Sequence, residues 1–244
     1  MSLVEHILNL SPHKLWDFLN HPWKIPFFLG FARILPPAQA IHSLFPEVDQ
    51  ALAEAYRLHF LGNHGFFDEM ERKNLECRRR RIIWHPWHEF LYVAVRLCQP
   101  AVVVETGVFD GRSSAIILQA LEDNGSGFLV SIDLPAQETI DGSTQRMAET
   151  ILPSGCPPGW MIPDHLRIRH RLLLGDSKDL LSRILSEHQP VGMFLHDSLH
   201  TFAHQMFEYV SAWECLENGG LLLSDDILWS RAFYRFCRKH QRIR

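Results

Sequence analysis

The sequence predicts an α/β protein with a Rossmann-like, doubly wound and mostly parallel sheet, helices on both faces and a helical extension at its N-terminus. From residue 101 onward, short apolar runs alternate with segments of helical periodicity. A glycine turn over residues 107–111 follows the first of these runs, and acidic residues stand at the ends of several of them. A chain of 244 residues suits one such domain together with an extension.

Two parts of the chain are expected. Residues 1–80 contain several prolines and are predicted to form a helical extension or cap, with helices near residues 48–61 and 67–79. Residues 81–244 are predicted to form the sheet domain, beginning with a helix over residues 87–97 that ends before Gln99-Pro100.

Strands and helices are then expected to alternate. Apolar runs predict strands at residues 101–104, 128–133, 166–174, 192–196 and 221–224. The segments between them predict helices at residues 113–122, 143–151, 179–187 and 201–216. The Asn-Gly-Gly of residues 218–220 is the expected C-cap of the last helix.

Composition excludes several classes of protein. A net charge of −4 gives no bulk attraction to nucleic acid, so no nucleic-acid partner is expected. The five cysteines are scattered and odd in number, which favours reduced thiols in the cytoplasm over a disulfide framework or a thiolate zinc site. The apolar stretch at residues 25–40 is interrupted by prolines and is too short to span a bilayer, although peripheral membrane contact stays open.

The first strand leads into an unusual glycine turn. Glu105, Gly107, Gly111 and Ser113 give the pattern E-x-G-x-x-x-G-x-S, without the middle glycine of a dinucleotide fingerprint. An acid before the first glycine suits a cationic ligand better than a phosphate, and Asp133 after the second strand can bind ribose hydroxyls. The pattern predicts a nucleoside-bearing cofactor, disfavours a nicotinamide enzyme, and has an ordinary βαβ turn as its alternative.

A second set of acids follows the fourth and fifth strands. Asp197 comes directly after the fourth strand with His200 three residues later, and Asp225 and Asp226 follow the fifth. Because neighbouring parallel strands end at one rim, these carboxylates would repel one another unless a cation lies between them. Mg²⁺ or another hard divalent cation would meet that need, and His200 could accept a proton. Helix N-capping by Asp197 and Asp225, with a structural His200, is the alternative.

These motifs resemble a known family over about residues 84–235. The glycine turn looks like motif I of the class I S-adenosylmethionine-dependent methyltransferases. The D-x-x-H and the G-G-x-x-x-x-D-D patterns look like the metal-dependent branch with macrocin-type and mycinamicin-type sugar O-methyltransferases and cephalosporin hydroxylase-like proteins. Two departures are Ser198, where most relatives carry glycine, and Asp225, where many carry glutamate.

The resemblance implies a role for each matched position. It implies that S-adenosylmethionine is bound by Glu105, Gly107, Gly111, Ser113 and Asp133. It implies adenine contacts from Asp176 and Ser177, which could equally cap a helix. It implies Mg²⁺ ligation by Asp197, Asp225 and Asp226, with His200 as the general base.

The implied function is metal-assisted O-methylation of a small hydroxylated acceptor, such as a sugar on a natural product, in the cytoplasm. A cephalosporin hydroxylase-like activity and a non-catalytic S-adenosylmethionine-binding protein are the alternatives. Family sheets finish with a sixth and an antiparallel seventh strand, whereas this sequence ends where the sixth would begin. Missing C-terminal strands, and a homo-oligomer formed through an unpaired edge, are therefore expectations as well.

Overall fold

The computed structural model describes residues 36–78, 81–135, 152–153 and 155–240 of the chain. Residues 37–244 belong to one compact unit, and residues 1–36 form a separate unit that is almost wholly outside the described part. Helices near residues 48–61 and 67–79 therefore belong to the same unit as the sheet, and the boundary at residue 80 stays a prediction. Among the described residues, no helix combines the length and the apolar character needed to cross a membrane.

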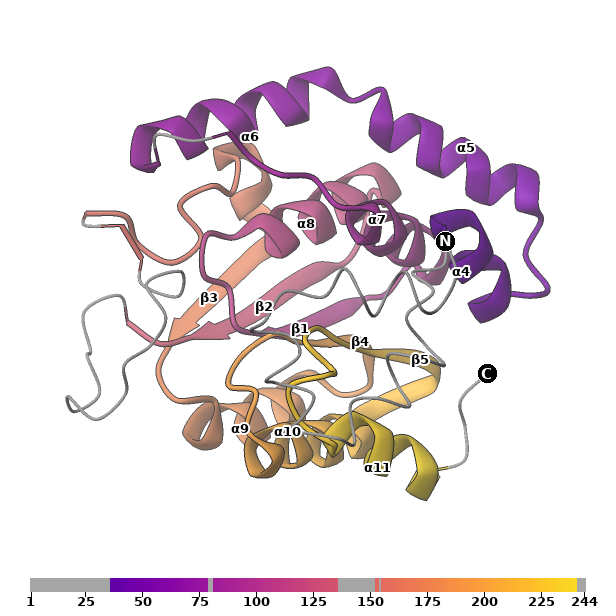
Figure 1. Ribbon diagram of the computed structural model, residues 1–244, viewed down its shortest axis with the longest axis vertical. Helices are drawn as coiled ribbons and strands as arrows, with labels where there is room; N and C mark the ends of the chain where they lie inside the picture. Colours follow the sequence, from indigo (N-terminus) through magenta and orange to yellow (C-terminus); the bar gives the residue numbers. More distant parts are fainter. Residues whose placement is uncertain (1–35, 79–80, 136–151, 154, 241–244) are drawn as a thin grey trace, which may run out of the picture. The chain divides into compact units, whose positions relative to one another are not determined.

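Five parallel strands form the sheet, in the order β3-β2-β1-β4-β5 (Figure 1). The strands are β1 (Val102–Thr106), β2 (Phe128–Asp133), β3 (His170–Leu174), β4 (Val191–His196) and β5 (Leu216–Ser224). The chain builds outward from β1 to β3 and then returns to the other side of β1 with β4. This reversal is the topological switch point of a doubly wound sheet, and the predicted fold class is confirmed.

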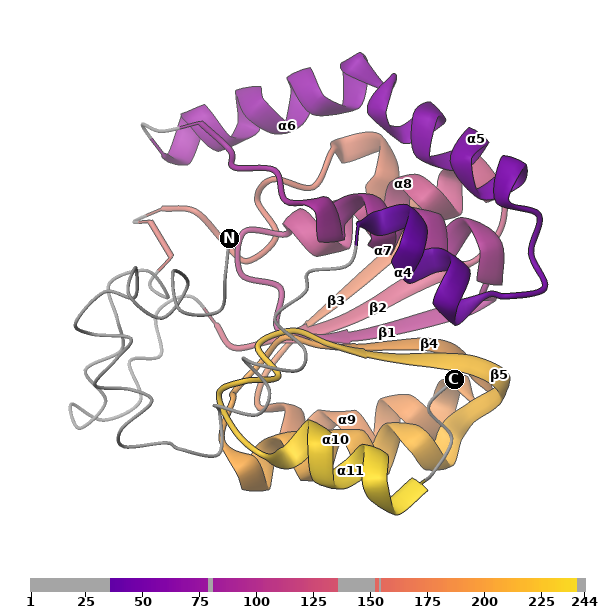
Figure 2. The same ribbon diagram turned by 45° about the vertical axis from the view of Figure 1, so that its right-hand side comes forward.

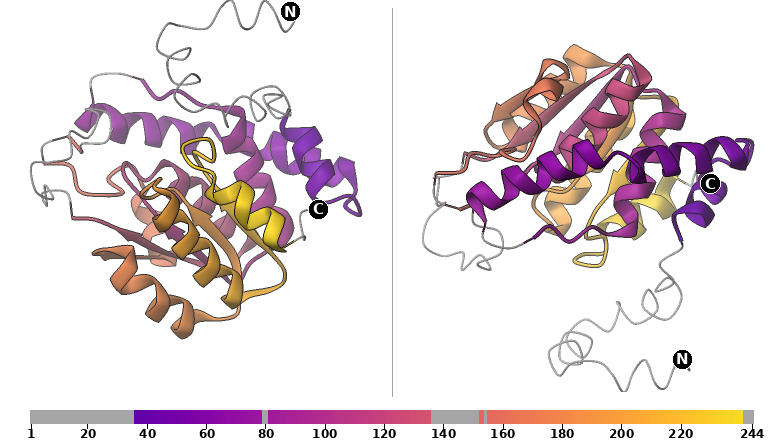
Figure 3. Two further views of the ribbon diagram at one scale, coloured as in Figure 1. Left: turned by 60° about the horizontal axis from the view of Figure 1, so that its bottom comes forward. Right: turned by 90° about the horizontal axis from the view of Figure 1, so that it is seen from above.

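Helices cover both faces of the sheet (Figure 2). One side carries α4 (Pro37–Leu44), α5 (Gln50–Leu61), α6 (His64–Cys77), α7 (Pro86–Cys98) and α8 (Arg112–Asn124). The opposite side carries α9 (Ser177–His188), α10 (Phe202–Cys215) and α11 (Ala232–His240). Seen from above, α5 and α6 run across the outside of the first group (Figure 3).

Burial on both faces explains why the strands are continuously apolar rather than alternating. Val103 lies in the core cluster shared with α7 and α8, whereas its neighbours Val102 and Val104 lie in the cluster shared with α9 and α10. A strand covered on both faces has apolar residues at every position, which is the pattern that the sequence carries.

The largest differences from the predicted boundaries are at the starts of β5 and β3. Strand β5 begins at Leu216, so Asn218–Gly220 lies within the strand and does not cap α10. Val191 pairs with Leu216 but Met193 pairs with Leu221, so the intervening residues bulge out of the ladder, with Gly219 at φ +88°. Residues 166–169, expected at the start of the third strand, belong instead to a 3₁₀ helix over Asp164–Arg169. The helix predicted at residues 143–151 lies outside the described residues.

The cysteine prediction is wrong for one pair. Cys77, at the end of α6, forms a disulfide with Cys156, and 79 residues separate them in sequence. Cys98, Cys215 and Cys237 are free thiols. An odd count without a spacing motif gave no sign of the pair, because only the fold brings these two residues together. The predicted cytoplasmic location depended on reduced thiols, whereas disulfides persist in oxidising compartments. The cytoplasmic location therefore stays a prediction.

Replacing Cys77 by serine should lower the free energy of unfolding by about 2 to 4 kcal/mol, because the open chain regains the entropy of a long loop. Urea unfolding under non-reducing conditions measures the change. Cys98→Ser, at a half-buried free thiol, is the control and should cost less. Identical unfolding midpoints for the wild type with and without reductant would show that the bond does not form.

Candidate functional site

The glycine turn lies at the switch point of the sheet. It follows β1 and precedes α8, and its position is set by strand ends on both sides. Gly107 N–H donates to the carbonyl of Ile132 in β2 at 2.9 Å, and Asp197 N–H donates to the carbonyl of Thr106 at 2.8 Å. The C-terminal ends of β1, β2 and β4 therefore meet here, where ligands of doubly wound folds bind.

Both glycines of the turn are required by contacts within the protein. Gly107 has φ +83°, and a Cβ atom there would stand 2.0 Å from the carbonyl oxygen of Asp197. Gly111 has φ +88°, and a Cβ atom there would stand 2.7 Å from the Cα atom of Gly159. The glycines let the turn pack against the segment after β4 and against the loop at residues 155–163.

Glu105 is wholly buried beneath the turn, with 0% of its surface exposed. Its carboxyl oxygens accept hydrogen bonds from Ser113 and Ser114, at 2.6 Å each, and from Ser131 at 2.8 Å. Burial raises the pKa of Glu105, although the three hydroxyls act in the opposite direction. Glu105 and Ser113 thus bind each other and hold the start of α8 against β1. Their direct contact with a cofactor stays a prediction.

Asp133, the last residue of β2, is half-buried and faces the turn. Its Oδ2 accepts from the backbone N–H groups of Val108 and Phe109, at 3.1 and 2.7 Å, and its Oδ1 accepts from Leu134 N–H at 2.7 Å. The acid predicted to bind ribose therefore also sets the conformation of the glycine turn.

The two residues predicted to contact adenine lie at the start of α9. Asp176 is exposed and caps the helix, accepting from Lys178 N–H at 2.9 Å. Ser177 is buried, and its hydroxyl donates to Glu208 at 2.6 Å. Helix capping, the alternative given by the sequence, is confirmed for Asp176, and the adenine contacts stay predictions.

The second acidic set surrounds His200. The Nε2 atom of His200 lies 3.7 Å from Oδ1 of Asp197 and 3.8 Å from Oδ2 of Asp226. Asp225 accepts from Asp226 N–H through its Oδ1 at 2.8 Å. Thr201, not Asp197 or His200, caps α10. The capping alternative therefore does not account for Asp197 or His200.

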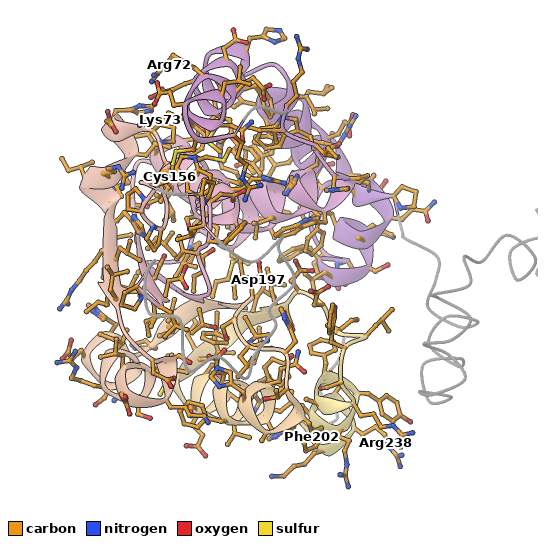
Figure 4. The ribbon with its side chains drawn as sticks, turned by 60° about the vertical axis from the view of Figure 1, so that its left-hand side comes forward. Arg72, Lys73, Cys156, Asp197, Phe202 and Arg238 are labelled. Carbon is orange, nitrogen blue, oxygen red and sulfur yellow. A yellow bond between two sulfur atoms is a disulfide. The ribbon has the colours of Figure 1, made fainter. Side chains whose placement is uncertain are left out.

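The pKa values of two of the acids and of His200 are shifted in opposite directions. The pKa of Asp197 is raised well above its usual value by burial and by the nearby charges of Asp225, Glu105, Asp226 and Asp110. Burial and Asp225 likewise raise the pKa of Asp226. In contrast, burial and then the charge of His196 lower the pKa of His200 to about 4, so its imidazole is neutral at pH 7. Figure 4 shows Asp197 in the middle of the molecule, between the two groups of helices.

The predicted metal ligands do not form a metal site as they stand. Asp197, Asp225 and Asp226 supply the hard oxygen donors that Mg²⁺ prefers. Yet within the described part of the chain, no three His, Cys, Asp or Glu side chains are grouped so that they could hold a metal ion. The Mg²⁺ role therefore stays a prediction, and no chemical step is derived from it.

Sequence reasoning missed the polar groups beneath this rim. His196, His204 and Glu208 are buried, each histidine is hydrogen-bonded to Glu208, and none of them was assigned a role from the sequence. Their spacing fits no metal or catalytic motif. Only one feature of the sequence could have indicated them: polar residues stand at positions of β4 and α10 that periodicity assigns to the interior.

Comparison with known proteins identifies the family. The sequence profile of a methyltransferase domain family matches residues 104–227, just over half of the chain. The chain belongs to this family, and the prediction of a methyltransferase is confirmed. The narrower resemblance to the macrocin and cephalosporin hydroxylase-like branch stays a prediction. No curated protein matches the chain significantly.

Solved structures show the same fold at low identity. An O-methyltransferase from Bacillus cereus in complex with SAH superposes with a TM-score of 0.50 at 14% identity, covering 72% of this chain and 77% of that one. The O-methyltransferase TomG from Streptomyces achromogenes, involved in tomaymycin synthesis and in complex with SAM, gives 0.49 at 16% identity, covering 72% and 76%. The first of these likenesses supports the fold and nothing narrower.

Replacing Gly107 by alanine should destabilise the protein more than the same change at Gly125. Both residues have positive φ, which costs an alanine about 1 to 2 kcal/mol. Only Gly107 would also place a Cβ against backbone, because no atom lies within 4 Å of the corresponding position at Gly125. Denaturant unfolding of the two variants measures the difference. Equal losses would contradict the close approach of the turn to Asp197.

Proposed function

We propose that the chain is an S-adenosylmethionine-dependent O-methyltransferase that acts on a hydroxyl of a small molecule, such as a sugar on a natural product. The observation that carries the proposal is the position of the glycine turn, between Asp133 on one side and Asp197 on the other, at the switch point of the sheet. Membership of the methyltransferase domain family supports the type of reaction. The structural neighbour from Bacillus cereus was solved in complex with SAH, which suggests the donor.

The charge of this rim fits the proposed donor. Carboxyl groups gather where the cofactor would bind, and burial followed by their mutual repulsion raises the pKa of Asp197 and Asp226. A positively charged ligand relieves such repulsion, whereas a phosphate would increase it. When bound, S-adenosylmethionine supplies an electrophilic methyl group on a sulfonium ion. Asp133 would hold its ribose, and the first turn of α8 would lie beside its amino-acid end.

His200 is the proposed general base. Its imidazole is neutral at pH 7 and lies between Asp197 and Asp226, which would stabilise the positive charge that it gains. The acceptor hydroxyl gives its proton to His200 as its oxygen bonds to the methyl carbon. S-adenosylmethionine would supply the methyl group and would keep the electron pair of the broken carbon–sulfur bond, becoming a neutral thioether. The protein's contribution is to hold the oxygen in line and to take the proton.

Metal assistance is a separate part of the proposal. The resemblance of the D-x-x-H and D-D patterns to a metal-dependent branch supports it. The arrangement of Asp197, Asp225 and Asp226 in the described part of the chain does not. A divalent cation would have to draw Asp197, Asp225 and Asp226 together as it binds. His200 can act as base in either case.

Isothermal calorimetry with S-adenosylhomocysteine tests the cofactor half. The wild type should bind it and should give no heat with NAD⁺, and Asp133→Asn should weaken binding roughly tenfold or more, because a charged hydrogen-bond acceptor is lost. Asp123→Asn, the same change at the far end of α8, is the matched control and should bind like the wild type. Undetectable binding by the wild type would contradict the proposal and favour a non-catalytic role.

A turnover assay over a panel of hydroxylated glycosides and phenols tests the acceptor half, with mass spectrometry of the product. A gain of one methyl group is expected, whereas a gain of one oxygen would point to hydroxylation. His200→Gln should slow transfer about 10²- to 10⁴-fold while S-adenosylhomocysteine still binds. Transfer by this variant at the wild-type rate would exclude His200 as base. Full turnover in excess chelator would exclude the metal.

A further inference from the structure

The carboxylate of Glu208, on α10, is the most heavily hydrogen-bonded side chain near the site. It is 0% exposed, and five side chains contact it. They are Thr106 Oγ1 at 2.5 Å, His196 Nδ1 at 2.5 Å, Ser177 Oγ at 2.6 Å, His204 Nε2 at 2.8 Å and Ser198 Oγ at 2.9 Å. Burial by itself raises the pKa of Glu208, but the bonds from His196 and His204 outweigh it and hold the pKa below its usual range. Glu208 is therefore ionised and accepts every one of these bonds.

These contacts reach three of the segments that carry predicted site residues. Thr106 ends β1 and precedes Gly107 of the turn. His196 ends β4 and precedes Asp197. Ser177 begins α9 and follows Asp176. One carboxylate thus joins the strand end that leads to the cofactor turn, the strand end that leads to the acidic rim, and the start of a third element.

The contact also extends toward the proposed base. The His196 ring packs edge-to-face against the His200 ring, with centroids 5.5 Å apart and planes at 84°. Since Glu208 accepts from Nδ1, this nitrogen of His196 carries a proton and the ring is held in one orientation. The His200 ring rests on a neighbour that cannot turn without breaking a buried charge-assisted bond.

An arrangement of this kind is costly to build for stability alone. Burying a carboxylate carries a large desolvation penalty that its hydrogen bonds only offset, and replacing a complete buried ionic network by well-packed apolar residues is often neutral or stabilising. The geometry indicates a different role for the carboxylate, because donors from the end of β1, the end of β4 and the start of α9 meet at it, and these segments must come together for the rim to form.

The geometry points to Glu208 as a positioning residue that holds the glycine turn and His200 in register with each other, although it would touch neither cofactor nor acceptor. The inference rests on the proposed function, which makes the glycine turn the cofactor site and His200 the base. The effect of Glu208 on His200 can nevertheless be measured without any ligand. Glu208→Gln keeps the shape of the side chain but replaces one acceptor oxygen by a donor. At least one of His196 and His204 must then change tautomer or lose its bond.

Two measurements on the folded, full-length chain test the inference. Histidine side-chain NMR reports the tautomers of His196 and His204 and the surroundings of His200, and calorimetry reports the affinity for S-adenosylhomocysteine. In Glu208→Gln, the signals of His200 should shift and the affinity should fall by roughly tenfold, the loss expected for a misplaced charged contact. Tyr92→Phe is the control, because it removes a buried hydrogen bond to Asp123 at the opposite end of the sheet. It should lower the melting temperature and change neither signal.

Thr106→Val is the second variant, for use if Glu208→Gln does not fold. It removes a single donor with almost no change in volume, and it should weaken S-adenosylhomocysteine binding while leaving the His200 signals in place. The inference is overturned if folded Glu208→Gln loses stability like Tyr92→Phe but keeps wild-type His200 signals. If the wild type fails to bind S-adenosylhomocysteine while Glu208→Gln still shifts the His200 signals, the proposed function fails and the positioning role stands.

Discussion

Two carboxylates with no exposed surface, Glu105 and Glu208, hold the C-terminal rim of the sheet together. A buried charge is tolerated only where donors surround it, so each acid requires hydroxyls or imidazoles at defined points. Glu105 is bonded to three serines from α8 and β2, and Glu208 to side chains from β1, β4 and α9. These requirements tie the ends of three strands to the starts of two helices, and the glycine turn, Asp133, Asp197 and His200 all lie at or next to those ends.

The charge at the rim follows from this construction. Asp197 stands where β4 ends, and burial, together with the nearby acids after β5 and Glu105, raises its pKa. Carboxyl groups placed in this way favour a positive ligand, and they surround a histidine that burial keeps neutral. A sulfonium donor and a hydroxyl acceptor that must lose a proton are a suitable pair for such a surface. The same acids would repel the pyrophosphate of a dinucleotide.

Local patterns were enough to predict much of the fold. Strand β2 begins and ends where its apolar run does, because burial on both faces makes the run continuous. The positions of Gly107, Asp133, Asp197 and Asp226 at one rim also followed from sequence, since parallel strands end together. The Cys77–Cys156 bond and the contacts of Glu208 could not be predicted in this way, because they join residues that only the tertiary fold brings together. The early start of β5 was not predicted, because glycines at this position normally mark the end of a helix.

A crystal structure with S-adenosylhomocysteine is the most direct test of the account. It should place the ribose hydroxyls within hydrogen-bonding distance of Asp133, and the sulfur atom on the side of the turn that faces Asp197 and His200. The contacts of Glu105 and Glu208 should be unchanged, because the site is built before the ligand arrives. A nucleoside bound elsewhere, or a rim in which Glu208 has left His196, would contradict it.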